Sequence, residues 1–131
     1  MSDPYLPPQS ALVVAAPTAL TNDDKTMAAV AHGLGVVTGF LGPALIYLAY
    51  NGRSKFVEFH ALQSLAIQII STVVLIAITL LTCGIGAILA LPLIPLIMGL
   101  EAWHAYRAYN GEWAAYPLLE KIGADKLPDA G

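Results

Sequence analysis

The order of apolar and polar residues divides this chain into a few long apolar segments. No Asp, Glu, Lys or Arg occurs from Thr26 to Gly52, and none occurs from Ala61 to Leu100. A helix needs roughly 20 apolar residues to cross the hydrocarbon core of a bilayer. The first segment therefore accommodates one crossing, and the second accommodates two, separated by glycines close to Cys83. The pattern predicts an all-α integral membrane protein with three transmembrane helices.

Capping and turn signals set the expected boundaries. Asp23 and Asp24 favour the positive end of a helix dipole, and Asn-Gly pairs are typical of turns. Prolines inside the apolar segments predict a kink in the first helix and a bend in the third. The expected elements are a Pro-rich extended tail over 1–21, a membrane domain over 22–122 with helices at 24–50, 54–81 and 85–109 and a short interfacial helix at 117–122, and a frayed C-terminus over 123–131.

Composition supports a membrane protein and excludes several function classes. Charged residues make up 11% of the chain, where about 25% is usual in soluble proteins. The net charge of −3 and the lack of a basic, aromatic-rich patch argue against a nucleic-acid partner. No motif of nucleophilic, metal-dependent or phosphate-binding catalysis occurs. We expect no catalytic residue, no metal site and no cofactor.

The distribution of basic residues predicts an orientation. With three crossings, Arg53, Lys55, Arg107, Lys121 and Lys126 share one side of the membrane, and only Lys25 lies on the other. Loops rich in Lys and Arg stay in the cytoplasm. The sequence therefore predicts a multi-pass protein of the prokaryotic inner membrane with its N-terminus outside and its C-terminus in the cytoplasm.

Small and polar residues mark the faces that we expect to pack inside the protein. Polar residues recur every three or four positions along the second helix, which places them on one stripe. A side-chain amide that faces lipid would remain unsatisfied at a cost of several kcal/mol, and glycines let helix backbones approach closely. The alternative is a stripe that lines a water or substrate path. The predicted packing residues are Gly35, Gly39, Gly42, His60, Ser64, Gln68 and Ser71.

A second group of residues should gather at the cytoplasmic interface. Glu101 and His104 are three residues apart on one helix face. His60 and His104 are weak candidates for haem ligands, although a surface ion-pair cluster is the simpler interpretation. His32 is expected to lie too far away to join them. The predicted interface charge cluster consists of Arg53, Lys55, Glu58, Glu101 and Arg107.

Several stretches suggest a family. The segments DDKTMAAVAHGLG, LGPALIYLAYNGRSKFVEFHALQSLAIQI and YRAYNGEWAAYPL cover roughly residues 22–122. Together they resemble a prokaryotic domain-of-unknown-function family that is similar to the Tic-twenty component of the chloroplast inner-envelope import machinery. The resemblance implies a helical membrane fold and defines no catalytic residue.

Two hypotheses of function follow. The first is a non-enzymatic accessory or scaffold subunit of a larger membrane complex, whose partners are the lipid bilayer and either other membrane subunits or further copies of itself. The alternative is a Tic-like translocation or channel component that works as an oligomer. A cofactor-binding redox subunit that uses His60 and His104 is a third, weaker hypothesis.

Overall fold

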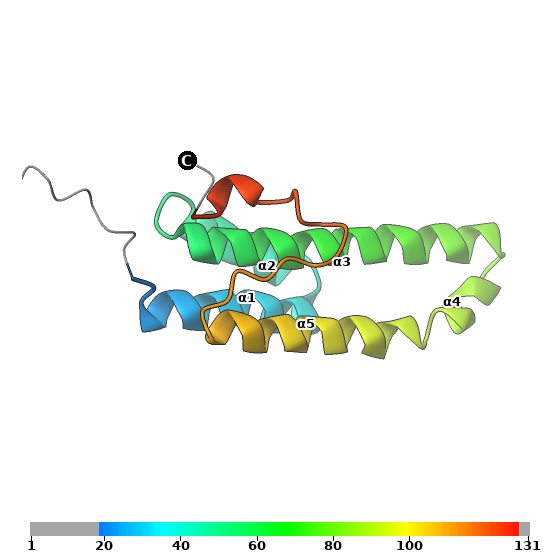
Figure 1. Cartoon of the computed structure of the whole chain (residues 1–131). Helices are drawn as coiled ribbons and strands as arrows, with labels where there is room; N and C mark the ends of the chain where they lie inside the picture. The colour runs from blue at the N-terminus through cyan, green and yellow to red at the C-terminus, as the bar shows by residue number, and fades with distance from the viewer. Residues whose placement is uncertain (1–18, 129–131) are drawn as a thin grey trace, which may run out of the picture.

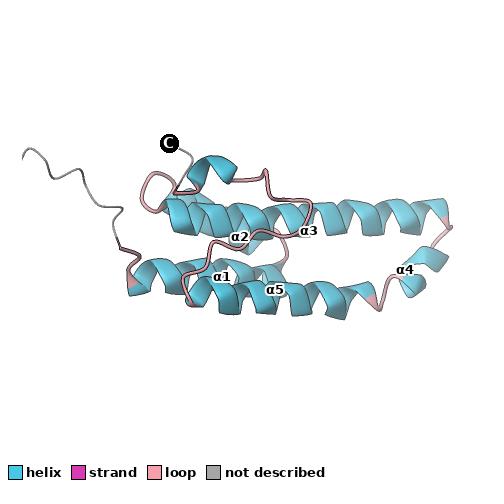
Figure 2. Ribbon diagram, viewed as in Figure 1, coloured by secondary structure: helices cyan, strands magenta, loops and turns pink. Residues whose placement is uncertain are grey.

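The computed structural model describes residues 19–128, so most of the predicted tail and the last three residues lie outside the described part. Within that part the chain is helical and contains no β-strand (Figure 2). The elements are α1 (Asn22–Thr38), α2 (Leu41–Tyr50), α3 (Lys55–Leu81), α4 (Ile85–Leu89), α5 (Leu93–Tyr109) and the 3₁₀ helix η2 (Ala124–Lys126).

The expected single helix over 24–50 is instead a hairpin of α1 and α2. Gly39 ends α1 with a positive φ of 64°, a conformation that glycine adopts without strain. The hairpin brings the end of α2 back to the start of α1, where the Tyr50 hydroxyl donates to Asp23 Oδ2 at 3.1 Å. Pro43 causes no kink, because it lies in the first turn of α2, where no backbone N–H is needed.

The turn of this hairpin contains no charge and satisfies its own polar groups. The Thr38 hydroxyl donates to the Leu34 carbonyl and accepts from the Gly42 N–H, both at 2.8 Å. The turn between α3 and α4 has the same arrangement of hydrogen bonds. The Thr82 hydroxyl donates to Ile78 O at 2.7 Å and accepts from the Gly86 N–H at 2.5 Å. Backbone groups without a partner would be costly at these positions inside a bilayer.

The long apolar segment of the chain forms a second, longer hairpin. Among the described residues, α3 is the one helix both long and apolar enough to cross a membrane. The returning helix expected at 85–109 is divided into α4 and α5, and the break lies just before Pro92, which has no N–H to continue the ladder. Three transmembrane helices are therefore not found as such.

The two hairpins differ in length, and this difference gives the molecule two distinct ends (Figure 1). At one end α1, α2, α3 and α5 pack together, and there the first third of α3 is buried. At the other end only α3, α4 and the start of α5 remain, and their large apolar side chains are exposed. The exposed set on this half includes Val73, Ile76, Leu80, Leu81, Ile85, Ile88, Leu89 and Leu91.

The described chain begins and finishes at the four-helix end (Figure 1). Lys25 lies in the first turns of α1, near Gly111 beyond α5, and so shares this end with the other five basic residues. The predicted three crossings would separate residues 19 and 128, whereas the described chain starts and ends at the same end of the bundle, because residues 22–50 form a hairpin that returns to its starting point.

Residues 110–123 form a strap that crosses over α3 at the four-helix end (Figure 1). The interfacial helix expected at 117–122 is absent, and these residues form turns. The described part of the C-terminal segment is not frayed as predicted, because Lys126 Nζ lies 2.8 Å from Glu58 Oε2 and η2 packs on α3. Residues 129–131 lie outside the description.

Candidate functional site

A buried polar network lies at the centre of the four-helix end. His32 of α1 and Glu101 of α5 are both fully buried, with Nδ1 2.6 Å from Oε2. His32 Nε2 lies 3.1 Å from Nδ1 of His60 on α3. The expectation that His32 is too far from these residues is wrong. Since α1 and α2 fold back on themselves, His32 lies level with the start of α3 and the end of α5.

Three further hydrogen bonds converge on the carboxylate of Glu101. The Ser64 hydroxyl and the Gln68 amide donate to Oε1 at 2.8 and 3.1 Å. The Tyr116 hydroxyl donates to Oε2 at 2.8 Å. Glu101 is therefore not part of a surface charge cluster, as the sequence had suggested, but the central acceptor of the core.

Gly35 makes room for this carboxylate. A methyl group at Gly35 would lie 2.6 Å from both Glu101 Oε1 and Ser64 Oγ, closer than real side-chain contacts. Fully buried Ala28, Ala31 and Ala108 line the same contact between α1 and its neighbours. Small residues of this kind let helices approach until buried polar side chains can meet.

The other glycines of the predicted packing set have different roles. Gly39 has open space beside its α-carbon and serves the turn rather than a helix contact. Gly42 packs against Leu34 and Thr38 within the first hairpin. The packing face therefore includes Gly35 and Gly42 but not Gly39.

The network also holds the C-terminal strap. His60 Nε2 lies 2.8 Å from the backbone oxygen of Glu112. The side-chain amide of Gln63 donates to the carbonyls of Leu119 and Ile122 at 2.9 and 2.7 Å and accepts from the Tyr116 N–H at 2.9 Å. The start of the polar stripe on α3 therefore faces protein, and it binds a segment without regular secondary structure.

Tyr116 joins the strap to the core. Its ring stacks on that of His104, with centroids 3.8 Å apart. His104 Nδ1 lies 3.0 Å from the Leu100 carbonyl of its own helix. Burial and the neighbouring Glu101 carboxylate raise the pKa of the Tyr116 phenol, so Tyr116 remains a hydrogen-bond donor at any physiological pH.

The remaining residues of the expected charge cluster are distributed over separate contacts. Arg107 Nε pairs with Glu112 Oε2 at 2.7 Å, and Glu58 pairs with Lys126. The Arg53 guanidinium lies 5.2 Å from the centre of the Tyr50 ring. Lys55 is exposed at the start of α3. The structure therefore does not bring the five predicted cluster residues together.

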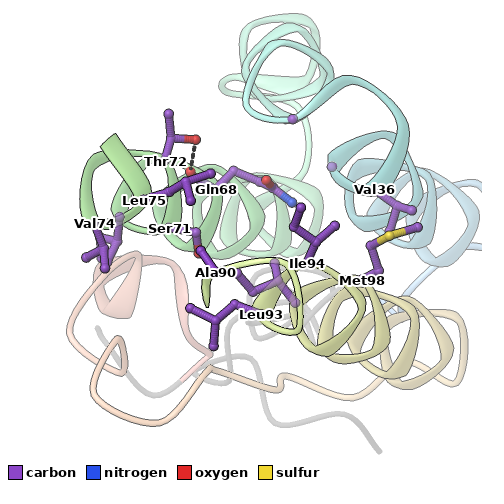
Figure 3. A pocket seen from close by; sticks show the side chains of 14 residues that line it. Val36, Gln68, Ser71, Thr72, Val74, Leu75, Ala90, Leu93, Ile94 and Met98 are labelled. Carbon is purple, nitrogen blue, oxygen red and sulfur yellow. Dashed lines mark hydrogen bonds between the residues drawn. The ribbon is translucent and has the colours of Figure 1, made fainter. Parts of the chain in front are cut away.

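The polar stripe of α3 ends at a groove of about 340 Å³ where the short hairpin stops (Figure 3). Gln68 and Ser71 lie on the α3 side of this groove, and Ala90, Leu93 and Met98 lie on the α4 and α5 side. Ser71, which was predicted to pack between helices, lines this largely apolar space. The groove opens beside Gly35 and therefore next to the buried network.

The polar groups of the network are engaged with one another and with the strap. In residues 19–128 no group of three or more His, Cys, Asp or Glu side chains is arranged to hold a metal ion. Both ring nitrogens of His60, one of the weak haem candidates, already face protein partners. No buried side-chain polar atom of the described part lacks a hydrogen-bond partner.

Sequence reasoning missed His32 and Tyr116. The one local signal near His32 is Thr38-Gly39, where α1 ends and α2 turns back, so that α1 starts at the same end as α3. The aromatic ring of Tyr116 lies in a segment that the sequence had assigned to the membrane surface.

Comparison with known proteins assigns the chain to a family. The MamF_MmsF family, described as the magnetosome magnetite crystal formation protein family, matches residues 23–122. This finding overturns the resemblance to the Tic-twenty-like family, for which no comparison gave support. No curated protein and no solved structure matched the chain. Because the match covers most of its length, the chain belongs to the magnetosome magnetite crystal formation protein family.

Proposed function

We propose that this protein is a non-enzymatic subunit of the magnetosome membrane that supports magnetite crystal formation by organising that membrane and its proteins. The observation that carries the proposal is the family match over residues 23–122. The nature of the surface supports it, because exposed apolar side chains cover the half of the molecule beyond the polar network. A surface of this size and polarity requires lipid or membrane-protein contacts.

The two hairpins suggest how the protein lies in the bilayer. From His60 to Leu81, α3 is about 32 Å long, close to the roughly 30 Å of a hydrocarbon core. The hairpin of α3, α4 and α5 would therefore reach the far side of the core. The hairpin of α1 and α2 would enter the same leaflet and return, since α1 is about 25 Å long and α2 about 15 Å.

The placement of charge supports one orientation of this arrangement. All six Lys and Arg residues belong to the four-helix end, and the turn between α3 and α4 has no charged residue. By the positive-inside rule that end would face the cytoplasm. The described start and finish of the chain would then both be cytoplasmic.

An accessory role fits the network better than a transport role. Every buried polar side-chain atom in the described residues has a partner inside the protein. A water-filled path needs polar groups that face the path, whereas Gln63 and Ser64 bind protein carbonyls and Glu101. The start of the polar stripe on α3 therefore favours internal packing.

The proposal can be tested in a magnetite-forming bacterium that carries this protein. A tagged chromosomal copy should co-purify with isolated magnetosomes, and deletion should change the size distribution of crystals in electron micrographs. Reintroduction of the wild-type chain should restore it. Recovery of the tagged protein only in other membranes, with crystals unchanged after deletion, would reject the proposal.

A second measurement distinguishes a complex with other membrane proteins from a homo-oligomer of this chain. The tagged protein, extracted in mild detergent, should migrate on a native gel in a band that contains other magnetosome membrane proteins. Migration as a small homo-oligomer would instead favour an organiser that acts through copies of itself.

A further inference from the structure

The buried network has a fixed number of protons, which its hydrogen-bond partners reveal. The Glu112 carbonyl can only accept, so Nε2 of His60 carries a hydrogen. The carboxylate of Glu101 already accepts from Ser64, Gln68 and Tyr116. Three donors to one carboxyl group favour its ionised form.

An ionised Glu101 determines the state of His32. Its Oε2 lies 2.6 Å from His32 Nδ1, so a hydrogen must lie on that nitrogen. The Tyr116 oxygen, 3.3 Å from the same nitrogen, is placed to accept from it as well. His32 Nε2 and His60 Nδ1 then face each other at 3.1 Å with one place for a hydrogen between them.

Two bare lone pairs at this distance would repel, and a hydrogen between them gives the two rings one positive charge. That charge is required by burial, because an uncompensated Glu101 anion in the core would cost several kcal/mol. Within residues 19–128 no Lys or Arg lies within ion-pair distance of Glu101, whose ion-pair partner is His32. Arg107 pairs with Glu112 and Lys126 pairs with Glu58, and α2 has no charged residue.

We propose that His32 and His60 form a binding site for one proton, shared between their facing ring nitrogens, and that this cation balances Glu101 and fastens the C-terminal strap. Two hydrogen bonds tie the strap to the histidine pair and Glu101. His60 donates to the Glu112 carbonyl, and the Tyr116 hydroxyl donates to Glu101. Loss of the proton would leave a buried anion, and protonation of Glu101 would leave a buried cation. Either change would weaken the attachment of the strap.

His104 is the control residue for this site. It is buried beside His32, with ring centroids 5.7 Å apart, and it stacks on Tyr116. Its Nδ1 donates to the Leu100 carbonyl at 3.0 Å, and neither of its ring nitrogens faces another histidine. Its Nε2 lies 3.4 Å from the Ala115 carbonyl, beyond the usual N–H···O distance, so that nitrogen needs no hydrogen and the ring stays neutral. It shares the environment of the pair without sharing the proton.

The test is nitrogen NMR of the full chain, with ¹⁵N-labelled histidine, in detergent micelles at neutral pH. We expect one imidazolium signature per molecule, distributed over two of the three rings, and its persistence in His104→Gln. In Glu101→Gln the counter-charge is gone, so we expect loss of the imidazolium signature and faster amide exchange at residues 112–116.

Three results would overturn the proposal. One is three neutral rings in the wild-type protein, together with an infrared band of a protonated carboxyl group that disappears in Glu101→Gln. Another is loss of the imidazolium signature in His104→Gln. The third is an unchanged signature in folded Glu101→Gln. If Glu101→Gln does not fold, the wild-type and His104→Gln spectra still decide the question.

Discussion

His32 and Glu101 lie 69 positions apart in the sequence, yet their side chains form the shortest link between α1 and α5, at 2.6 Å. Both side chains are completely buried. This pair exists because the first apolar segment turns back at Gly39 rather than continuing across the bilayer. The fold of residues 22–50 therefore places an acid and a base together in the core.

Removal of the acid should destabilise the protein strongly. In Glu101→Ala the donors of Ser64, Gln68 and Tyr116 lose their acceptor, and the histidines lose their counter-charge. Breaking a buried pair on one side costs about 3 to 5 kcal/mol. Denaturant unfolding in mixed micelles, followed by circular dichroism, measures the difference.

The matched control for this variant is Glu112→Gln. Glu112 pairs with Arg107 at the surface, where both side chains are at least 36% exposed. A pair of this kind contributes about 0 to 1 kcal/mol, and the backbone carbonyl of Glu112 that binds His60 is retained. If both variants lost the same free energy of unfolding, the buried His32–Glu101 pair would contribute no more to stability than a surface ion pair.

Two glycines of α1 should respond in opposite directions to alanine. Alanine at Gly35 would clash with Glu101 and Ser64, whereas alanine at Gly33 would meet nothing within 4 Å. Gly33→Ala should stabilise α1 by about 0.5 to 1 kcal/mol through helix propensity. Gly35→Ala should lower the free energy of unfolding and disturb the His32 resonances. A stabilised Gly35→Ala protein would contradict the close approach of α1 and α5.

The hairpin turn between α3 and α4 should depend on one hydroxyl group. Thr82→Val keeps the shape of the side chain but removes the acceptor of the Gly86 N–H and the donor to Ile78 O. An unsatisfied buried donor costs about 1 to 3 kcal/mol. Thr72→Val is the control, because the Thr72 hydroxyl only bonds back to Gln68 O on an exposed helix face. Amide exchange at Gly86 should rise in the first variant and not in the second.

Much of the helical part of the fold follows from the sequence. The Asn51-Gly52 turn signal and the charge-free stretch from Ala61 to Leu100 predicted a helix over 54–81, where α3 (Lys55–Leu81) lies. Pro92 marks the interruption before α5. The end of α1 was not predicted, because a Thr-Gly pair in an apolar run equally fits a continuous membrane helix, where glycine is frequent.

The site could be predicted only in fragments. The polar stripe of α3 indicated that His60, Ser64 and Gln68 face protein, because an amide in lipid is costly. Their partners could not be inferred, since His32 reaches them through the hairpin turn and Tyr116 through a strap without a periodic pattern. The resemblance to the Tic-twenty-like family, which rested on three local segments, was also wrong, since the family match is to the magnetosome family.

The first turn of α1 should lose stability in acid. Burial by itself raises the pKa of Asp24, but hydrogen bonds from the side chain of Ser54 and from the backbone and hydroxyl of Thr21 outweigh it and lower the pKa. A lowered pKa in the folded state stabilises the protein above the unfolded value of 3.8. This contribution is lost as the pH falls through the folded pKa. Stability measured from pH 7 down to pH 2 should therefore converge for the wild type and Asp24→Asn, and a constant difference would contradict the role of the carboxylate.

The last prediction concerns the side of the membrane on which each end lies. Cys83 is the only cysteine of the chain and is exposed in the turn between α3 and α4. In a Cys83→Ser background, single cysteines at exposed Asn22 and Lys121 should react with a membrane-impermeant maleimide from the same side of sealed, oriented vesicles. The native Cys83 should not react from that side, because about 32 Å of apolar helix separates it from His60. Labelling of Asn22→Cys and Lys121→Cys from opposite sides would restore three crossings and exclude the proposed insertion of both hairpins from one face.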